Sequence, residues 1–343
     1  MGNEPRILLY ERHHSLTNTV SNVWNGLTDG SIFRQLRGHL NNRFLTFQKI
    51  HKSSLEAFPK LVNIELTNYC NHKCKFCVTG LDTNTREKGK MNFSTFKLIA
   101  DQLSPGTLLI LAGFGEPFLN PELESFLEYA HSRGLSRDLE ILSNFGAISE
   151  KRVRKLLDYP FKRLVISLDS MSKETFLAYR GCDDFDNVCD KIKILADELA
   201  KRKSISQEIV LQMVINKKNN HERESFIDFA KKMGLIPRIK QLNTHNSKVG
   251  EAAINEFEVR ELSRYTNKDY SFACEWIWGG MMVLWSGDVT ICCQDPIGTE
   301  VYGNVKNDSI FDLLNTSRLR CCFRQRYFEN PGQIGICRRC DVA

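Results

Sequence analysis

Three unevenly spaced cysteines follow an apolar run and limit what this chain can bind. Cys70, Cys74 and Cys77 form the pattern C-x3-C-x2-C in the segment ELTNYCNHKCKFC. A tetrahedral zinc site needs four ligands and usually takes them from two C-x2-C pairs, so three thiolates leave one metal position open. Two alternatives stay open at this point: three unrelated cysteines, or a zinc site completed by His72.

Composition indicates where the chain works and which partners it lacks. The 343 residues include twelve cysteines, and the N-terminal segment MGNEPRILLYERHH lacks the apolar stretch of a secretory signal. We therefore expect a cytoplasmic protein whose cysteines bind metal, react or pack rather than form disulfides. The absence of an 18-residue apolar run argues against a membrane span. The formal net charge of +6 comes from dispersed Lys and Arg, so no nucleic-acid partner is expected.

Apolar runs typical of buried strands alternate with helix-like stretches along the middle of the chain. Ser149, Ser172 and Asn219 are candidate helix caps within this rhythm. Strands separated by helices form a parallel sheet with right-handed crossovers. The sequence therefore predicts an α/β fold, a partial (βα)6 TIM-like barrel, whose chemistry collects at the carboxyl ends of the strands. The six runs lie at 61–67, 107–113, 139–144, 163–169, 208–215 and 236–242.

The strand–helix rhythm changes near residue 270. The segment MMVLWSGDVTICC, at 281–293, favours a β-hairpin, and a short helix is expected around 309–316. We predict three parts: an N-terminal helical or loop extension at 1–58, the partial barrel at 59–267, and a small Cys-rich α+β domain at 268–343.

The three-cysteine loop after the first strand resembles that of the radical S-adenosylmethionine (SAM) superfamily. The resemblance implies a [4Fe–4S] cluster on Cys70, Cys74 and Cys77, with the amino and carboxylate groups of SAM on the open iron. Reductive cleavage of SAM would then give a 5′-deoxyadenosyl radical, which removes a hydrogen atom from the substrate. Electron-transfer clusters usually have four cysteines and no open iron.

Two further stretches match cofactor-binding features of the same superfamily. Phe76, just before the last cysteine, would lie near the adenine. In GFGEP, Gly113 and Gly115 would allow close backbone approach, and Glu116 would accept a hydrogen bond from the ammonium group of SAM. Phe114 stands where relatives often have a second glycine, and a simple turn is the alternative interpretation.

Polar residues at the next strand ends complete the expected cofactor site. The resemblance implies that Asn144 contacts the ribose or methionyl part of SAM and that Ser167 and Asp169 contact ribose hydroxyls. Arg180 would pair with the SAM carboxylate. Strand-end capping or plain surface polarity is the alternative for all four.

A second group of cysteines lies near the C-terminus. Cys274, Cys292, Cys337 and Cys340 form the pattern C-x17-C-x44-C-x2-C around the predicted hairpin. The group resembles the SPASM/Twitch extension of radical SAM enzymes and implies an auxiliary [4Fe–4S] cluster that exchanges electrons. Because the sequence ends three residues after Cys340, we expect one auxiliary cluster. A structural zinc site is the alternative.

The remaining cysteines need assignment. On a strand, Cys292 and Cys293 face opposite ways, and Cys293 shares the apolar side, so Cys292 is the chosen ligand. Cys321 and Cys322 are expected to pack, with a role as iron ligand or hydrogen-atom donor left open. Packing is also expected of Cys182 and Cys189.

The resemblance predicts a radical SAM oxidoreductase. The expected reaction is a two-electron oxidation of a sugar, aminocyclitol or nucleoside-like metabolite, with the auxiliary cluster as acceptor and a flavodoxin or ferredoxin as electron donor. Redox-neutral epimerisation or decarboxylation, and maturation of a ribosomally made peptide, are the alternatives. Gln241, Asn243 and His245 are candidates for the substrate pocket or are plain linker residues.

Overall fold

The computed structural model describes residues 8–9, 59–202, 205–241 and 274–338. Within these residues, ten strands form one sheet. They are β1 (Leu8–Leu9), β2 (Leu61–Ile64), β3 (Leu108–Leu111), β4 (Leu139–Ser143), β5 (Arg163–Ser167), β6 (Glu208–Ile215), β7 (Ile236–Gln241), β8 (Gly280–Val283), β9 (Asp288–Thr290) and β10 (Val301–Asn304).

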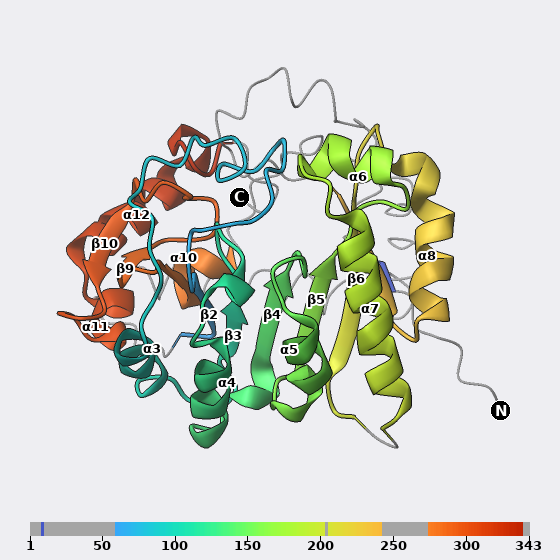
Figure 1. Cartoon of the computed structure of the whole chain (residues 1–343). Helices are drawn as coiled ribbons and strands as arrows, with labels where there is room; N and C mark the ends of the chain where they lie inside the picture. The colour runs from blue at the N-terminus through green and yellow to red at the C-terminus, as the bar shows by residue number, and fades with distance from the viewer. Residues whose placement is uncertain (1–7, 10–58, 203–204, 242–273, 339–343) are drawn as a thin grey trace, which may run out of the picture. The chain divides into compact units, whose positions relative to one another are not determined.

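Helices connect these strands and cover the sheet. Figure 1 shows α4, α5 and α7 along one face of the strands. The α-helices are α3 (Phe93–Ala100), α4 (Leu123–Ser132), α5 (Glu150–Lys155), α6 (Lys173–Arg180), α7 (Phe185–Ala200), α8 (Arg223–Lys232), α10 (Glu275–Gly279), α11 (Ile310–Asn315) and α12 (Arg318–Glu329). The 3-10 turns are Pro117–Leu119, Ser136–Asp138, Leu156–Asp158, Asn220–Glu222 and Pro331–Gln333.

The strands β2 to β7 pair in chain order, and every neighbouring pair is parallel. All six predicted strands are present, which confirms the α/β class and the partial barrel. On β6, Ile209, Leu211 and Met213 pack into the core shared with the helices. Because side chains alternate along a strand, Gln212 and Val214 face the other side of the sheet. The outer side of β6 is therefore apolar, whereas its inner side carries the polar side chain of Gln212.

Caps explain where several helices begin. The Ser149 hydroxyl accepts from Arg152 N, and the Ser172 hydroxyl accepts from Thr175 N, so both predicted caps are confirmed. Asn219 precedes a 3-10 turn without capping it, and its side-chain amide donates instead to the carbonyl of Asp169 at 2.8 Å. The prediction at this position was wrong because a long-range partner takes the side chain.

The C-terminal hairpin continues the barrel sheet. β8 and β9 are antiparallel, which confirms the predicted hairpin. β8 also pairs in parallel with β2 over four residues, from Leu61 opposite Gly280 to Ile64 opposite Val283. This pairing was not predicted, and it makes the hairpin a direct extension of the strand that precedes the three-cysteine loop.

Some predictions fall outside the described residues. Of the expected extension at 1–58, the structure describes Leu8–Leu9, which pair in parallel with β7 instead of forming helix or loop. The boundary at 267/268 lies in an undescribed segment, so the domain limits stay predictions. No helix in the described part of the chain is long and apolar enough to cross a bilayer.

Candidate cofactor and iron–sulfur sites

The three-cysteine loop follows β2 and folds back on the end of α6. Lys73 N donates to the carbonyl of Arg180 at 2.9 Å, and Lys75 N donates to the carbonyl of Tyr179 at 3.1 Å. These bonds fix the backbone on which Cys70, Cys74 and Cys77 stand, and all three side chains are half-buried. Backbone hydrogen bonds to α6 therefore fix the conformation of the three-cysteine loop.

The three sulfurs lie in one electrostatic environment. Burial raises the pKa of the Cys70 thiol to about 12 and that of Cys74 to about 11, and charge on Cys77 contributes to both increases. The Arg180 guanidinium donates to Cys74 Sγ at 3.5 Å and so favours a thiolate there. Iron ligation requires thiolates, and a cluster of positive metal ions would supply the charge that they need.

His72 does not turn toward the three cysteines. Its Nε2 lies 2.8 Å from Asp184 Oδ2, and its ring contacts the edge of Phe176. Burial, followed by the charge of Arg180, lowers the pKa of His72 to about 4. These contacts give no support to a zinc site completed by His72. In the ranges that the structure describes, no three His, Cys, Asp or Glu side chains are grouped to hold a single metal ion.

The glycine-rich turn packs directly against the three-cysteine segment. A Cβ at Gly113 would lie 2.6 Å from the Cβ of Glu65, and one at Gly115 would lie 2.2 Å from the carbonyl of Thr67. Glu116 N donates to the carbonyl of Tyr69 at 2.8 Å. The close backbone approach expected of these glycines is present, and the segment approached is the chain leading to Cys70.

We expect Gly115→Ala to destabilise the protein by about 1–3 kcal/mol, because a methyl group would press on backbone atoms that cannot move aside. The measurement is denaturant unfolding of the anaerobic protein. Gly335→Ala is the matched control, since a Cβ there meets nothing within 4 Å, and it should stay within about 0.5 kcal/mol. Equal stability of the two variants would contradict the close approach.

Glu116 is buried and linked to the end of β4. Its Oε1 accepts from Phe118 N at 3.1 Å and from Ser143 Oγ at 2.7 Å, and its Oε2 accepts from Asn144 N at 2.7 Å. Burial raises the pKa of this carboxyl, while the three hydrogen bonds lower it. Since a carboxylate has about four acceptor positions, one remains for a ligand donor.

Asn144 connects the end of β4 to the three-cysteine loop. Its Nδ2 donates to Asn71 Oδ1 at 2.9 Å and lies 3.6 Å from Cys70 Sγ. Gly146 N donates to Asn144 Oδ1 at 2.8 Å, which fixes the orientation of the amide. The structure therefore brings this predicted residue to the first cysteine.

Asp169 and Arg180, two predicted cofactor residues, bind each other. They form a buried ion pair, and Arg180 also donates to the carbonyl of Ser167 at 2.7 Å. Asp169 has a left-handed backbone with a φ of 66°, and it also accepts from Val214 N. The Ser167 hydroxyl accepts from Gln212 Nε2 at 3.4 Å. The Asp169 carboxylate and the Arg180 guanidinium already bind each other, so a ligand of either group would have to share it with this ion pair.

Phe76 is part of a second, smaller hydrophobic cluster. Its ring contacts the edge of Tyr179 at a centroid distance of 4.3 Å. The cluster also contains Phe114 of the glycine-rich turn, together with Met282 and Leu284 of the hairpin. Apolar packing thus joins the three-cysteine loop to the C-terminal part of the chain.

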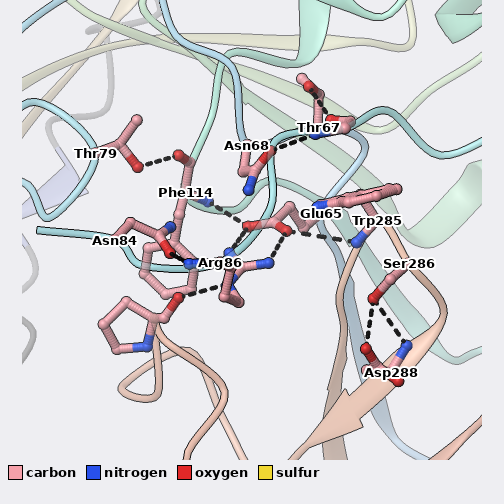
Figure 2. A network of polar contacts seen from close by, with 12 residues as sticks. Glu65, Thr67, Asn68, Thr79, Asn84, Arg86, Phe114, Trp285, Ser286 and Asp288 are labelled. Carbon is pink, nitrogen blue, oxygen red and sulfur yellow. Dashed lines mark hydrogen bonds and ion pairs between the residues drawn. The ribbon is translucent and has the colours of Figure 1, made fainter. Parts of the chain in front are cut away.

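A buried ion pair beside this cluster was not predicted (Figure 2). Arg86 Nη1 and Nη2 each lie 2.7 Å from one carboxylate oxygen of Glu65, whose side chain is 0% exposed. The same carboxylate accepts from Phe114 N and from Trp285 N, and Arg86 Nε donates to the carbonyl of Pro296 at 2.8 Å. This Glu65–Arg86 pair therefore ties the start of the three-cysteine segment, the glycine-rich turn and the hairpin together. In the sequence, the feature that could have indicated this ion pair is the carboxylate of Glu65, directly after the strand LVNI.

Three of the four cysteines in the second group come together. Cys274, Cys292 and Cys337 are buried, and burial raises the pKa of Cys292 far above the usual value, with Cys274 and Cys337 among its charged neighbours. Cys293 is half-buried against the smaller hydrophobic cluster. Because β9 ends at Thr290, strand alternation does not govern these two residues, yet Cys292 has two other predicted ligands, Cys274 and Cys337, among its neighbours. Cys340 lies outside the described residues.

The other predictions have mixed outcomes. The expectation that Cys321 and Cys322 pack was wrong, because both are exposed on α12. Cys182 and Cys189 do pack against the main core. The structure describes only the backbone of Gln241, and the other two pocket candidates, Asn243 and His245, lie outside the described residues.

Curated relatives are similar over part of this architecture. The probable GTP 3′,8-cyclase of Saccharolobus islandicus (strain Y.N.15.51) is 26% identical over 209 residues, which is 60% of this chain and 64% of the relative. The GTP 3′,8-cyclase of Aliarcobacter butzleri is 25% identical over 231 residues, or 62% of this chain and 66% of the relative. The chain thus spans just under two thirds of the length of these relatives.

Solved structures share the fold at low sequence identity. Streptococcus suis SuiB bound to the precursor peptide SuiA has a TM-score of 0.63 and 16% identity, covering 96% of this chain and 85% of SuiB. BtrN in complex with AdoMet and 2-DOIA has a TM-score of 0.54 and 17% identity, covering 83% of this chain and 94% of BtrN. At these identities the likeness concerns the fold alone.

Family models match both cysteine-containing parts of the chain. Residues 64–230 match the radical SAM superfamily, and residues 274–341 match the SPASM iron–sulfur cluster-binding domain. These matches imply SAM, a [4Fe–4S] cluster and an auxiliary cluster as cofactors. The half-buried three-cysteine loop and the buried Cys274, Cys292 and Cys337 are thiols of the kind that such clusters need. The chain belongs to the radical SAM superfamily and carries a C-terminal SPASM domain.

Proposed function

We propose that this radical SAM enzyme oxidises a small metabolite by two electrons and passes the second electron to the auxiliary cluster. The pairing of β8 with β2 carries the proposal, because it joins the hairpin that lies between Cys274 and Cys292 to the strand that precedes the three-cysteine loop. A redox site connected to the cofactor site through one sheet suits a reaction that releases an electron from the substrate. The proposed substrate carries an alcohol carbon, as in a sugar, aminocyclitol or nucleoside-like molecule.

The proposed reaction converts CH–OH to C=O, with a loss of two electrons and two protons from the substrate. When bound, SAM and the three-cysteine cluster supply a carbon-centred radical that removes one hydrogen atom from the substrate. The substrate then loses one proton and one electron, which completes a two-electron oxidation. A flavodoxin or ferredoxin is the proposed donor of the electron that starts each turnover.

The proposed cofactor-binding roles are those that the resemblance to the superfamily implies, and the hydrogen-bond geometry is compatible with them. The fourth acceptor position of Glu116 is proposed for the SAM ammonium, and Asn144 for the part of the cofactor nearest Cys70. Gly113, Gly115 and Phe76 would shape the backbone and apolar walls of the site. The proposed contacts to ribose and carboxylate would come from one connected group, formed by Ser167, Asp169 and Arg180. The Asp169–Arg180 ion pair would have to share its charges with whatever part of the cofactor binds there.

Modification of a ribosomally made peptide is the second candidate. The SuiB structure that resembles this chain is bound to a precursor peptide, and its fold covers nearly the whole chain. The BtrN structure instead holds AdoMet and 2-DOIA, which favours a small substrate. Redox-neutral epimerisation and decarboxylation are the remaining alternatives, and the following test distinguishes both from oxidation.

The test offers alcohol-bearing sugars, aminocyclitols and nucleosides to the anaerobically reconstituted enzyme with SAM and dithionite in D2O. We expect one carbonyl product per SAM consumed and no solvent deuterium on carbon. Deuterium at an inverted stereocentre would indicate epimerisation, and released CO2 would indicate decarboxylation; either would contradict the proposal.

A variant without auxiliary ligands provides the control for this experiment. Replacing Cys274 and Cys337 together with alanine should leave SAM cleavage in place and remove carbonyl product. Full product formation by this variant would rule out the auxiliary cluster as electron acceptor.

A further inference from the structure

Helix α12 buries two guanidinium groups within the C-terminal part of the chain. Arg320 is 0% exposed and Arg324 is 7% exposed, although arginine is among the residues least often found inside proteins. Both lie on one helical face with Phe323 and Tyr327, at spacings of three and four residues. The helix therefore presents two cations to the interior.

The hydrogen-bond partners of Arg320 and Arg324 are all neutral. Arg320 donates to the hydroxyl of Tyr302 and to carbonyls at 2.7–3.1 Å, and its Nε has no hydrogen-bond partner. Arg324 likewise donates to carbonyls at 2.8–3.3 Å. The accepting carbonyls are those of Trp276, Ile277 and Gly280 for Arg320, and those of Ile277, Trp278 and Leu314 for Arg324.

No Asp or Glu of the described residues forms an ion pair with either guanidinium. Besides the hydrogen bonds given above, the two groups have ring contacts with Tyr302 and Trp278, and charge on the Cys321 thiol would raise the pKa of Arg324. Burial, followed by the charge of Arg320, lowers the pKa of Arg324 to about 10. A buried cation without an anionic partner is costly, and two such cations side by side cost more. A nearby negative charge would offset this cost.

The two cations bind the short helix α10, which follows the first cysteine of the second group. The carbonyl to which both donate, that of Ile277, belongs to the short helix α10, which begins directly after Cys274. Tyr302, the hydroxyl partner of Arg320, has Cys292 among its charged neighbours. Cys274 and Cys337 act in turn on the pKa of Cys292, so these three cysteines lie near one another.

We propose that Arg320 and Arg324 are the counter-ions of the auxiliary cluster and raise its reduction potential. Four thiolates around an oxidised [4Fe–4S] core leave a net negative charge, and one-electron reduction adds another. Two fixed cations stabilise the reduced form more than the oxidised form, because the attraction grows with the charge. The auxiliary cluster is thereby poised to accept an electron.

The benefit of a raised reduction potential for catalysis rests on the proposed function. The reduction potential of the auxiliary cluster itself is measured without substrate. The experiment uses the full chain with Cys70, Cys74 and Cys77 replaced by alanine, so that the auxiliary cluster alone gives the signal. Anaerobic redox titration followed by electron paramagnetic resonance measures the ratio of reduced to oxidised cluster. If the arginine variants shift the reduction potential as expected but the enzyme oxidises no substrate, the proposed function is rejected and this inference is kept.

In this background, Arg324→Gln should lower the reduced-to-oxidised ratio at a fixed potential about tenfold, which equals a shift of about 59 mV for one electron. Arg324→Lys, which keeps the charge, should stay within about twofold of the parent. The matched control is Arg326→Gln on the same helix, because Arg326 is half-exposed and already paired with Glu300. Equal ratios for the Arg324→Gln and Arg326→Gln variants would overturn the proposal.

Arg320→Gln is a second, independent variant. If either glutamine variant fails to hold about four irons while the corresponding lysine variant holds them, positive charge is required to retain the cluster, which supports the proposal. Loss of iron from the glutamine and lysine variants alike would show that the arginines act only through hydrogen bonds to carbonyls. That result would overturn the assignment.

Discussion

Replacing Cys70, Cys74 and Cys77 together with alanine is expected to abolish reductive cleavage of SAM. The three sulfurs lie on one loop fixed by backbone bonds to Arg180 and Tyr179, so their removal takes away every proposed ligand of the first cluster without touching the second cysteine group. Iron in the reconstituted protein should fall from about eight to about four per chain. The measurements are anaerobic iron analysis and the yield of 5′-deoxyadenosine with dithionite.

The exposed cysteines of α12 provide a matched control for this variant. Cys321 and Cys322 are cysteines outside both buried groups, so replacing them with serine should leave about eight irons and normal SAM cleavage. SAM cleavage that survives in the triple variant would refute the assignment of the three-cysteine loop. Loss of all iron from the triple variant would instead show that the second group cannot hold a cluster alone.

The second large effect is expected from the Glu65–Arg86 pair shown in Figure 2. Glu65→Gln leaves the guanidinium of Arg86 in place, with a side chain only 12% exposed and without its opposite charge. Breaking a buried ion pair on one side costs about 3–5 kcal/mol, whereas exposed pairs contribute about 0–1 kcal/mol. We therefore expect the free energy of unfolding to fall by about 3 kcal/mol or more.

Two further variants test whether the missing charge is the cause. The double variant Glu65→Gln/Arg86→Met should recover part of the loss, because no unpaired cation remains. Asp190→Asn serves as the control, since Asp190 pairs with Lys193 on the surface and both side chains are more than half exposed. A Glu65→Gln variant within about 1 kcal/mol of the parent would show that water or another anion already compensates Arg86.

The sequence predicts those features that depend on local periodicity and fixed spacing. The six barrel strands are apolar runs bounded by helix-like segments, and the hairpin has a Ser-Gly-Asp connection, so both could be recognised from neighbouring residues. The capping roles of Ser149 and Ser172 are local in the same sense. Each depends on contacts a few residues apart.

Features that need a distant partner could not be predicted in this way. Glu65 and Arg86 are 21 residues apart, and nothing in either segment indicates that the other will neutralise it. Asp169 and Arg180 were both assigned to the cofactor, whereas the structure pairs them with each other. Helix α12 has the sequence RLRCCFRQRYFE, whose arginines would ordinarily indicate a solvent-facing surface, so its buried face was missed.

The pairing of β8 with β2 also has a cost for the protein when its metal is lost. β2 is an apolar strand whose edge is covered by four residues of β8, and β8 begins six residues after Cys274. Oxygen damage that strips iron from this end of the molecule would loosen β8 and uncover backbone donors and acceptors along β2. Such an uncovered edge pairs readily with the same edge of another copy, so we expect aerated preparations to aggregate.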